Sequence, residues 1–136
     1  MEAVFKESNL DVTFLSDAIA AADEYIYTDQ ALDFNGWVEQ SFLPEIIRLC
    51  RENGIQLILV RMPIQRFQTP GSQPEELDAY INNLAAYLSD KDVPFLDFDQ
   101  AKDFPNEYFE DTLHLNGKGR EEFTRRLTES LAEIID

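Results

Sequence analysis

The sequence has a single cysteine and a single histidine, and each scarcity excludes a class of site. Because Cys50 is alone, the chain can form neither an intrachain disulfide nor a thiolate metal cluster. Its helical spacing from Ile46 and Ile47 favours a structural thiol over a nucleophile. With His114 as the one imidazole, a metal site would rest on carboxylates, and none has metal-binding spacing. We therefore predict no metal and no cofactor.

Positive charge is also scarce, with 11 basic against 27 acidic residues and a formal net charge of -16. A surface this negative repels phosphate backbones, and no lysine or arginine cluster reverses the field locally, so nucleic acid is excluded as a partner. No apolar run approaches the length of a membrane span, and the first residues do not have the pattern of a secretory signal. We expect no membrane insertion by this segment; its compartment and oligomeric state stay unknown.

What is present is the composition of a globular protein, with 136 residues of which 44% are hydrophobic. This length predicts one α/β domain over 1–136. Hydrophobic periodicity and turn residues predict the following elements: helix 41–54, strand 55–61, helix 72–90, strand 93–98, an irregular connection 99–115 and helix 116–135. The alternation of helices and strands is typical of a parallel sheet with right-handed crossovers.

Three local features refine these elements. The apolar run 55–61 lacks polar alternation, which predicts a strand covered on both faces. Ser72 and Glu75 have the spacing of a capping box at the start of the second helix. Two strands are too few for a sheet, so the first 40 residues should add more: 11–16 reads as a strand, 17–25 as a helix and 27–40 as a loop or short helix.

His114 follows Asp111 in the pattern Asp-x-x-His, beyond the carboxyl end of the second strand, where ligand sites of open α/β sheets gather. An aspartate at this spacing can accept the Nδ1 proton and leave Nε2 as a general base. In so acidic a chain the spacing also arises by chance. Asn116 suits the cap of the last helix, and Gly117 and Gly119 leave room for close backbone approach.

Other candidates carry weaker patterns. Arg61 and Arg66 lie near the end of the first strand and could bind a carboxylate or phosphate of a ligand, or pair with neighbouring acids. Three aromatic residues could line an apolar pocket or belong to the core: Trp37, Phe67 and Tyr108.

The block DTLHLNGKGREEF, with Asp111, His114, Asn116 and Gly119, resembles the last motif of the SGNH, or GDSL-type, hydrolases and acyltransferases. The runs 55–64 and 93–98 resemble the last two strands of that fold, so the likeness covers about 41–136. It is nearest to the branch that modifies surface polysaccharides or lipid-linked polymers. The resemblance implies a three-layer α/β/α sandwich with a mainly parallel sheet, truncated or minimal.

For activity, the resemblance implies an ester hydrolase or O-acyltransferase with a serine nucleophile, His114 as base and Asp111 as its orienting partner. The substrate would be a small-molecule or polysaccharide ester, and the parent protein would be extracytoplasmic. The Gly-Asp-Ser and Gly-x-Asn-Asp blocks of the family have no match here. The nearest stretch places Ser16, Asp17 and Ala18 in the nucleophile block, with alanine at the serine position, and Ser16 and Ser41 are other candidates.

We therefore expect the C-terminal portion of an SGNH-like enzyme, carrying the Asp/His half of the site and inactive alone. A non-catalytic α/β binding module, or pseudoenzyme, is the alternative. A flavodoxin-like protein in which Asp-x-x-His is coincidental is a third reading.

Overall fold

The computed structural model describes residues 27–28 and 31–135, which form a mixed α/β structure around a small parallel sheet. Strand β1 (Leu59–Arg61) pairs in parallel with β2 (Phe95–Asp97), and Leu59 lies opposite Phe95. The parallel pair predicted from the helix and strand alternation is confirmed. The predicted strand 11–16 and helix 17–25 lie outside the described residues.

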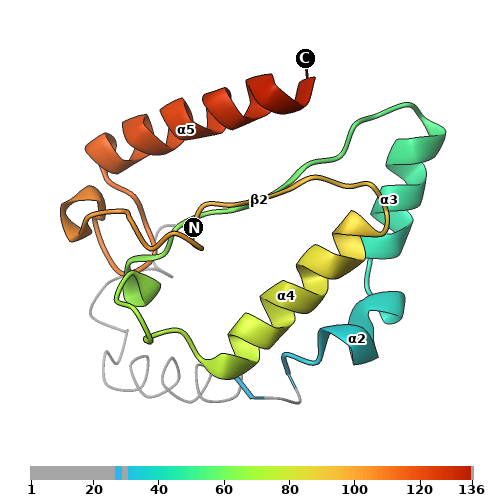
Figure 1. The fold of residues 1–136 in the computed structure, drawn as a ribbon, viewed down its shortest axis with the longest axis horizontal. Coiled ribbons are helices and arrows are strands. Elements are labelled where there is room, and N and C mark those ends of the chain that lie inside the picture. Colours follow the sequence, from blue (N-terminus) through green and yellow to red (C-terminus); the bar gives the residue numbers. More distant parts are fainter. Residues whose placement is uncertain (1–26, 29–30, 136) are drawn as a thin grey trace, which may run out of the picture.

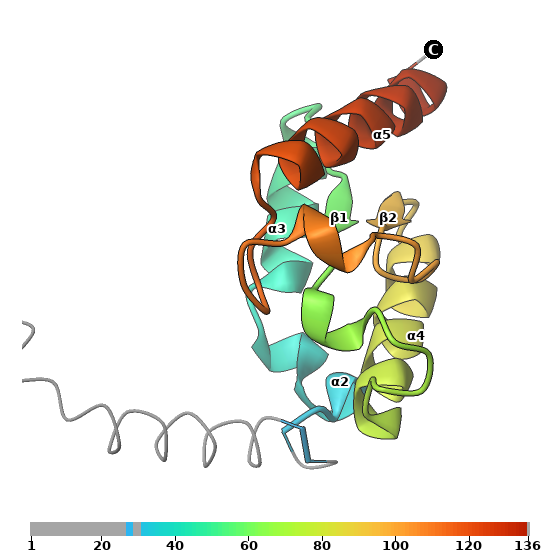
Figure 2. The same ribbon diagram turned by 90° about the vertical axis from the view of Figure 1, so that its left-hand side faces the viewer.

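Helices lie on both sides of the strand pair. Figures 1 and 2 show α5 on one side of the strands and Figure 1 shows α4 on the other, while Ile47 of α3 shares an apolar cluster with Leu88 of α4. The α-helices are α2 (Phe34–Trp37), α3 (Leu43–Glu52), α4 (Glu75–Ser89) and α5 (Gly117–Ile135), and the 3-10 helices are η2 (Val38–Gln40), η3 (Gln65–Phe67) and η4 (Asn106–Tyr108). In the described part of the chain, none of these helices has the length and apolar character needed to cross a bilayer.

Two apolar clusters form the core of the described residues. On the side of α3 and α4, Ile47, Leu88 and Val93 are buried together, and Leu59 of β1 packs against them. The second cluster lies near the start of α5 and is built by the buried side chains Phe104, Phe109 and Leu115, with Phe123 of α5 packed against it. The second cluster anchors the connection that carries Asp111 and His114.

Helix α3 forms for the reasons that its sequence gives. Pro44 stands in the first turn, where a missing N–H costs no hydrogen bond, and Gly54 follows the helix with a φ of 65°. The helix predicted over 41–54 is confirmed, with observed bounds Leu43–Glu52.

The capping box predicted for α4 is wrong. The cap residue is Pro74, which has no side-chain hydrogen bond to the helix. The Ser72 hydroxyl instead donates to the carbonyl oxygen of Thr69 at 2.6 Å and closes the preceding turn. The first turn contains three acidic residues, Glu75, Glu76 and Asp78. Their negative charges stabilise the N-terminus of α4 through the helix dipole.

Strand β1 is shorter and more open than predicted. It has three residues, and Val60 is 39% exposed while Leu59 packs in the core beneath α3 and α4. The expectation of a strand covered on both faces is therefore wrong for the described structure. The physical reason is that successive side chains of a strand point to opposite faces, and the Val60 face opens into a hollow beside the start of α5.

Candidate functional site

The candidate site is built on a tight loop between η4 and α5. Phe109 and Leu115 form an antiparallel bridge, and the N–H of Glu110 donates to the carbonyl oxygen of His114 at 2.8 Å. Phe109 is 7% and Leu115 5% exposed, so both ends of the loop are fixed in the core. The residues between them are held outward at the surface.

Asp111 and His114 form a dyad at the tip of this loop. Nδ1 of His114 lies 2.8 Å from Oδ2 and 2.9 Å from Oδ1 of Asp111. Oδ1 also accepts the backbone N–H groups of Leu113 and His114, each at 2.8 Å. The Asp-x-x-His spacing thus produces the contact expected from it, because the Asp111 carboxylate both caps the turn and holds the His114 ring in place.

The electrostatics of the dyad fix the roles of the two ring nitrogens. The backbone N–H of Leu113, followed by the side chain and the N–H of His114, lowers the pKa of Asp111 to about 2. An ionised carboxylate only accepts hydrogen bonds, so Nδ1 is the nitrogen that carries the proton. In the neutral ring the lone pair then lies on Nε2, the form that a general base requires. The side chain of His114 is 72% exposed, so this base is accessible.

A hollow of about 700 Å³ lies beside the dyad, at the carboxyl end of β1. Its lining is mainly apolar, and the residues are Val60, Arg61, Met62, Pro63, Ile64, Glu110, Leu113, His114, Leu115 and Arg120. Met62 is 50% and Leu113 57% exposed, so the hollow presents apolar surface to solvent. This combination of apolar walls and a few polar groups is typical of a small-molecule site.

Arg61 lines the hollow, but its guanidinium is bound within a polar network. It donates to Asp97 at 3.1 Å, to Asp99 at 2.8 Å and to Oε1 of Gln73 at 2.5 Å. The side chain is only 13% exposed. The guanidinium of Arg61 therefore has a structural role, because it binds side chains of the protein itself.

Arg66 lies elsewhere and does not line the hollow. Its guanidinium carbon is 5.3 Å from the ring centre of Tyr27 and 5.6 Å from that of Phe67. Its backbone N–H reaches the carbonyl oxygen of Thr112 at 3.4 Å, so the loop after β1 touches the loop of the dyad. The two arginines singled out from the sequence are thus not brought together at one ligand position.

The aromatic residues suggested as a pocket lining are also dispersed. Phe67 is buried, Tyr108 packs beside the second apolar cluster, and Trp37 lines a separate hollow together with Ser41. Ser41 accepts the N–H of Leu43 at 3.2 Å and donates to Val38, as a residue at a helix start does. Ser16 and Ala18 lie outside the described residues.

The described residues that line the hollow beside His114 contain no hydroxyl and no thiol. A nucleophile for this site would therefore come from a part of the protein beyond these lining residues. Among the residues that the structure describes, no cluster of three or more His, Cys, Asp or Glu could hold a metal ion.

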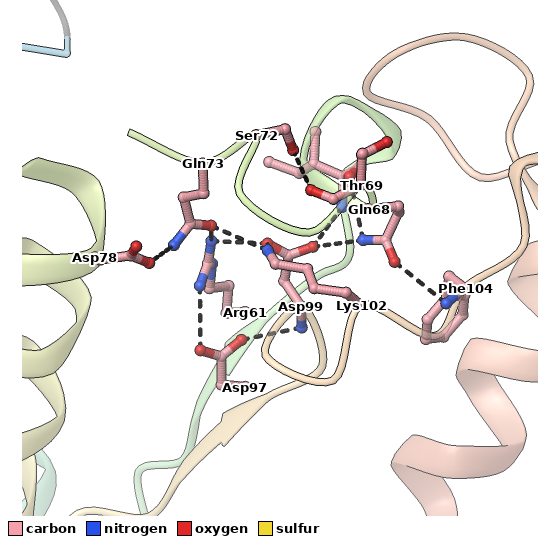
Figure 3. A network of polar contacts seen from close by, with 11 residues as sticks. Arg61, Gln68, Thr69, Ser72, Gln73, Asp78, Asp97, Asp99, Lys102 and Phe104 are labelled. Carbon is pink, nitrogen blue, oxygen red and sulfur yellow. Dashed lines mark hydrogen bonds and ion pairs between the residues drawn. The ribbon is translucent and has the colours of Figure 1, made fainter. Parts of the chain in front are cut away.

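Asp99 is the important residue that the sequence reading missed. Its side chain is fully buried, and Figure 3 shows it at the centre of the network that also contains Arg61. It accepts hydrogen bonds from Lys102 at 2.5 Å, from Gln68 at 2.6 Å and from the N–H of Ile64 at 3.2 Å. This network fixes the loop after β1, which supplies Met62, Pro63 and Ile64 to the hollow. The Asp-x-Asp pattern at the end of an apolar strand was the available signal.

The comparisons with known proteins give a family but no activity. No curated protein and no solved structure matches the chain. The model of one protein family, whose function is unknown, matches residues 7–136. Since the match spans nearly all of the sequence, the chain belongs to this family.

Proposed function

We propose that the chain carries the acid/base half of a serine esterase or O-acyltransferase site of the SGNH type. The observation that carries the proposal is the Asp111–His114 dyad, with Nδ1 bound to an ionised carboxylate and the ring lining an apolar hollow. The three-layer α/β/α sandwich of that family is part of the proposal. Helices on both sides of a parallel strand pair support it.

In this mechanism, Nε2 of His114 removes the proton from a serine hydroxyl as the hydroxyl oxygen attacks the ester carbonyl. The resulting imidazolium returns the proton to the leaving alkoxide, and water then repeats the sequence on the acyl-enzyme. Asp111 holds the ring and stabilises the imidazolium. The apolar walls of the hollow would receive the acyl group, and a small-molecule or polysaccharide ester is the expected substrate class.

The experiment uses the natural polypeptide that contains this chain, assayed with a short-chain aryl ester. His114→Ala should lower kcat by about 10²-fold to 10⁴-fold, the usual contribution of a general base. Glu129→Gln on the exposed surface of α5 is the control and should keep the parent rate. Equal turnover of the His114→Ala variant and the parent would refute the catalytic role.

The nucleophile is tested with a fluorophosphonate probe on the same polypeptide. A labelled serine identifies it, and Ser16→Ala tests the candidate within this chain. The segment 1–136 alone should neither label nor turn over ester, because the described walls of the hollow offer no hydroxyl.

The second candidate is a non-catalytic binding module that uses the same hollow. It is favoured by the hydroxyl-free lining and by alanine at position 18, where the resemblance would place the nucleophile. In that case the natural polypeptide should bind an apolar ester or its acid without turnover. Met62→Asp should weaken this binding, whereas His114→Ala should leave it within about twofold, because the ring would form only part of the wall.

A further inference from the structure

Arg120 lies in the first turn of α5 and lines the same hollow as His114. Its backbone N–H donates to the carbonyl oxygen of Asn116 at 2.9 Å, and the N–H of Gly119 donates to Oδ1 of the same asparagine at 3.1 Å. Nδ2 of Asn116 in turn donates to the carbonyl oxygen of Phe109 at 3.3 Å. These hydrogen bonds tie the start of α5 to the loop of the dyad, so the backbones of Arg120 and His114 are fixed relative to each other.

The guanidinium of Arg120 differs from those of the other arginines in the described part of the chain. Each of the others contacts the protein itself: Arg48, Arg125 and Arg126 bind glutamates of their own helices, Arg61 binds Asp99, Arg51 donates to a backbone carbonyl, and Arg66 lies over two aromatic rings. Arg120 is exposed and makes no such contact with a described residue. Its N–H groups can therefore donate to a ligand that enters the hollow.

The other charged residues on the hollow do not balance this guanidinium. Arg61 is bound to Asp97 and Asp99. Glu110 lines the same hollow, yet within the described structure it forms no ion pair with Arg120. In a chain with a net charge of -16, an arginine without an acidic partner is a local exception to the negative field. The hollow thus combines apolar walls, an accessible imidazole and one unpaired guanidinium.

We propose that Arg120 binds an anionic group of the ligand, so that the hollow selects an ester that also carries a carboxylate or a phosphate. A guanidinium binds both groups through paired N–H donors. The ester lies at His114, and the apolar chain between the two groups lies against the exposed side chains of Met62 and Leu113. This inference rests on the proposed function, because it assigns the ligand to the same hollow.

Binding to the chain 1–136, followed by NMR, tests the anion preference without any turnover. The probes are monoethyl adipate, which carries a carboxylate, and ethyl hexanoate, which has a methyl group in its place. At an ionic strength of about 0.15 M, where long-range repulsion by the other acidic residues is screened, the monoester should bind more tightly. It should also shift the signals of the Leu113 amide and the His114 ring in a saturable way. Hexyl phosphate repeats the measurement with the other anion.

A matched pair of variants assigns the preference to Arg120. Arg120→Gln should weaken binding of the monoester or of hexyl phosphate by at least about fivefold and leave ethyl hexanoate within about twofold, because only the anions lose a charged partner. Lys118→Gln removes the same charge from the same turn outside the hollow and should change neither. Equal affinity of the parent and Arg120→Gln for both anions would overturn the proposal, as would the absence of saturable shifts with either anion.

Glu110→Gln separates a ligand site from an ion pair within the protein. If Arg120 serves the ligand, the parent already binds the monoester, and removal of the nearby negative charge should strengthen that binding. If the parent does not bind and Glu110→Gln does, Glu110 is the partner of Arg120 in solution and the proposal fails.

Turnover by the natural polypeptide distinguishes this proposal from the catalytic one. Arg120→Gln should lower kcat/KM for the para-nitrophenyl monoester of adipic acid and keep kcat/KM for para-nitrophenyl hexanoate. Loss of the anion preference with both esters still hydrolysed through His114 would refute the role of Arg120 alone. Anion binding that depends on Arg120, without any dependence of turnover on His114, would refute the catalytic proposal and leave the binding role.

Discussion

Nδ1 of His114 and the carboxylate of Asp111 meet at 2.8 and 2.9 Å on the surface of the protein, where water competes for both groups. The contact persists because Asp111 also accepts two backbone N–H groups of the same turn. The turn therefore fixes the position of the Asp111 carboxylate, and the carboxylate fixes the orientation of the His114 ring.

The first prediction concerns the tautomer of His114. The parent should hold the neutral ring with the proton on Nδ1, as read from ¹⁵N chemical shifts of the imidazole. Asp111→Asn should shift the population toward the tautomer protonated on Nε2, because an amide can donate to Nδ1. Glu110→Gln removes the same charge from the neighbouring position and should leave the tautomer unchanged. An unchanged tautomer in Asp111→Asn would show that the carboxylate does not control the ring.

The second prediction is the acid dependence of the dyad. The pKa of Asp111 is lowered from 3.8 to about 2 by the N–H of Leu113 and by His114. A depressed folded-state pKa means that the contribution of Asp111 to stability is fully present above pH about 4 and is lost as pH falls through about 2. The ¹³C shift of the Asp111 carboxyl should titrate in this lower range. A midpoint at the ordinary aspartate value would contradict the contacts described.

The third prediction concerns Gly119, where α5 passes the backbone of η4. A Cβ added at Gly119 would overlap the carbonyl oxygen of Tyr108, whereas one added at Gly117 meets nothing within 4 Å. Gly119→Ala should therefore lower the free energy of unfolding by about 1–3 kcal/mol, measured by urea denaturation. Gly117→Ala is the control and should be neutral or slightly stabilising. Equal effects would contradict the close approach.

The fourth prediction concerns the buried carboxylate of Asp99. Asp99→Ala removes the partner of Arg61 and Lys102 and should lower the free energy of unfolding by about 3–5 kcal/mol, the usual cost of breaking a buried pair. Glu52→Ala breaks an exposed pair with Arg48 and should cost less than about 1 kcal/mol. Similar losses in the two variants would show that the network contributes no more than a surface pair.

The sequence predicted best what depends on neighbouring residues. The Asp111–His114 contact spans three positions, and the close approach at Gly119 was predicted from a glycine at the start of the last helix. For Gly117 the same argument fails, because open space surrounds it. A glycine shows that a close approach is permitted, and only the fold shows whether a neighbour is there.

The features that the sequence did not predict depend on residues far apart in the chain. Asp99 meets Gln68, Ile64 and Arg61 across separations of 31, 35 and 38 residues, which no local pattern encodes. Arg61 shows the same limit. Its position at the end of a strand was predicted correctly, but its partners were decided by the return of β2 beside β1.

The last prediction separates the two functions of Asn116. Its Oδ1 accepts the N–H of Gly119 at 3.1 Å and caps α5, as the sequence predicted, while its Nδ2 donates to the carbonyl oxygens of Glu107 at 2.7 Å and Phe109 at 3.3 Å. Asn116→Asp keeps an oxygen for the cap but loses both donated hydrogen bonds, and Asn116→Ala loses all three.

Asn116→Ala should therefore cost more free energy of unfolding than Asn116→Asp. The cap accounts for about 1 kcal/mol of the loss in the alanine variant. The aspartate variant should keep α5 but free the η4 backbone, so the amides of 106–110 should exchange faster while those of the first turn of α5 stay protected. If both variants lose protection equally in α5 and in η4, the prediction of two separable functions fails. The helix cap and the hydrogen bonds to the η4 backbone would then act as one unit, because the Asn116 amide that caps the helix also orders the loop before it.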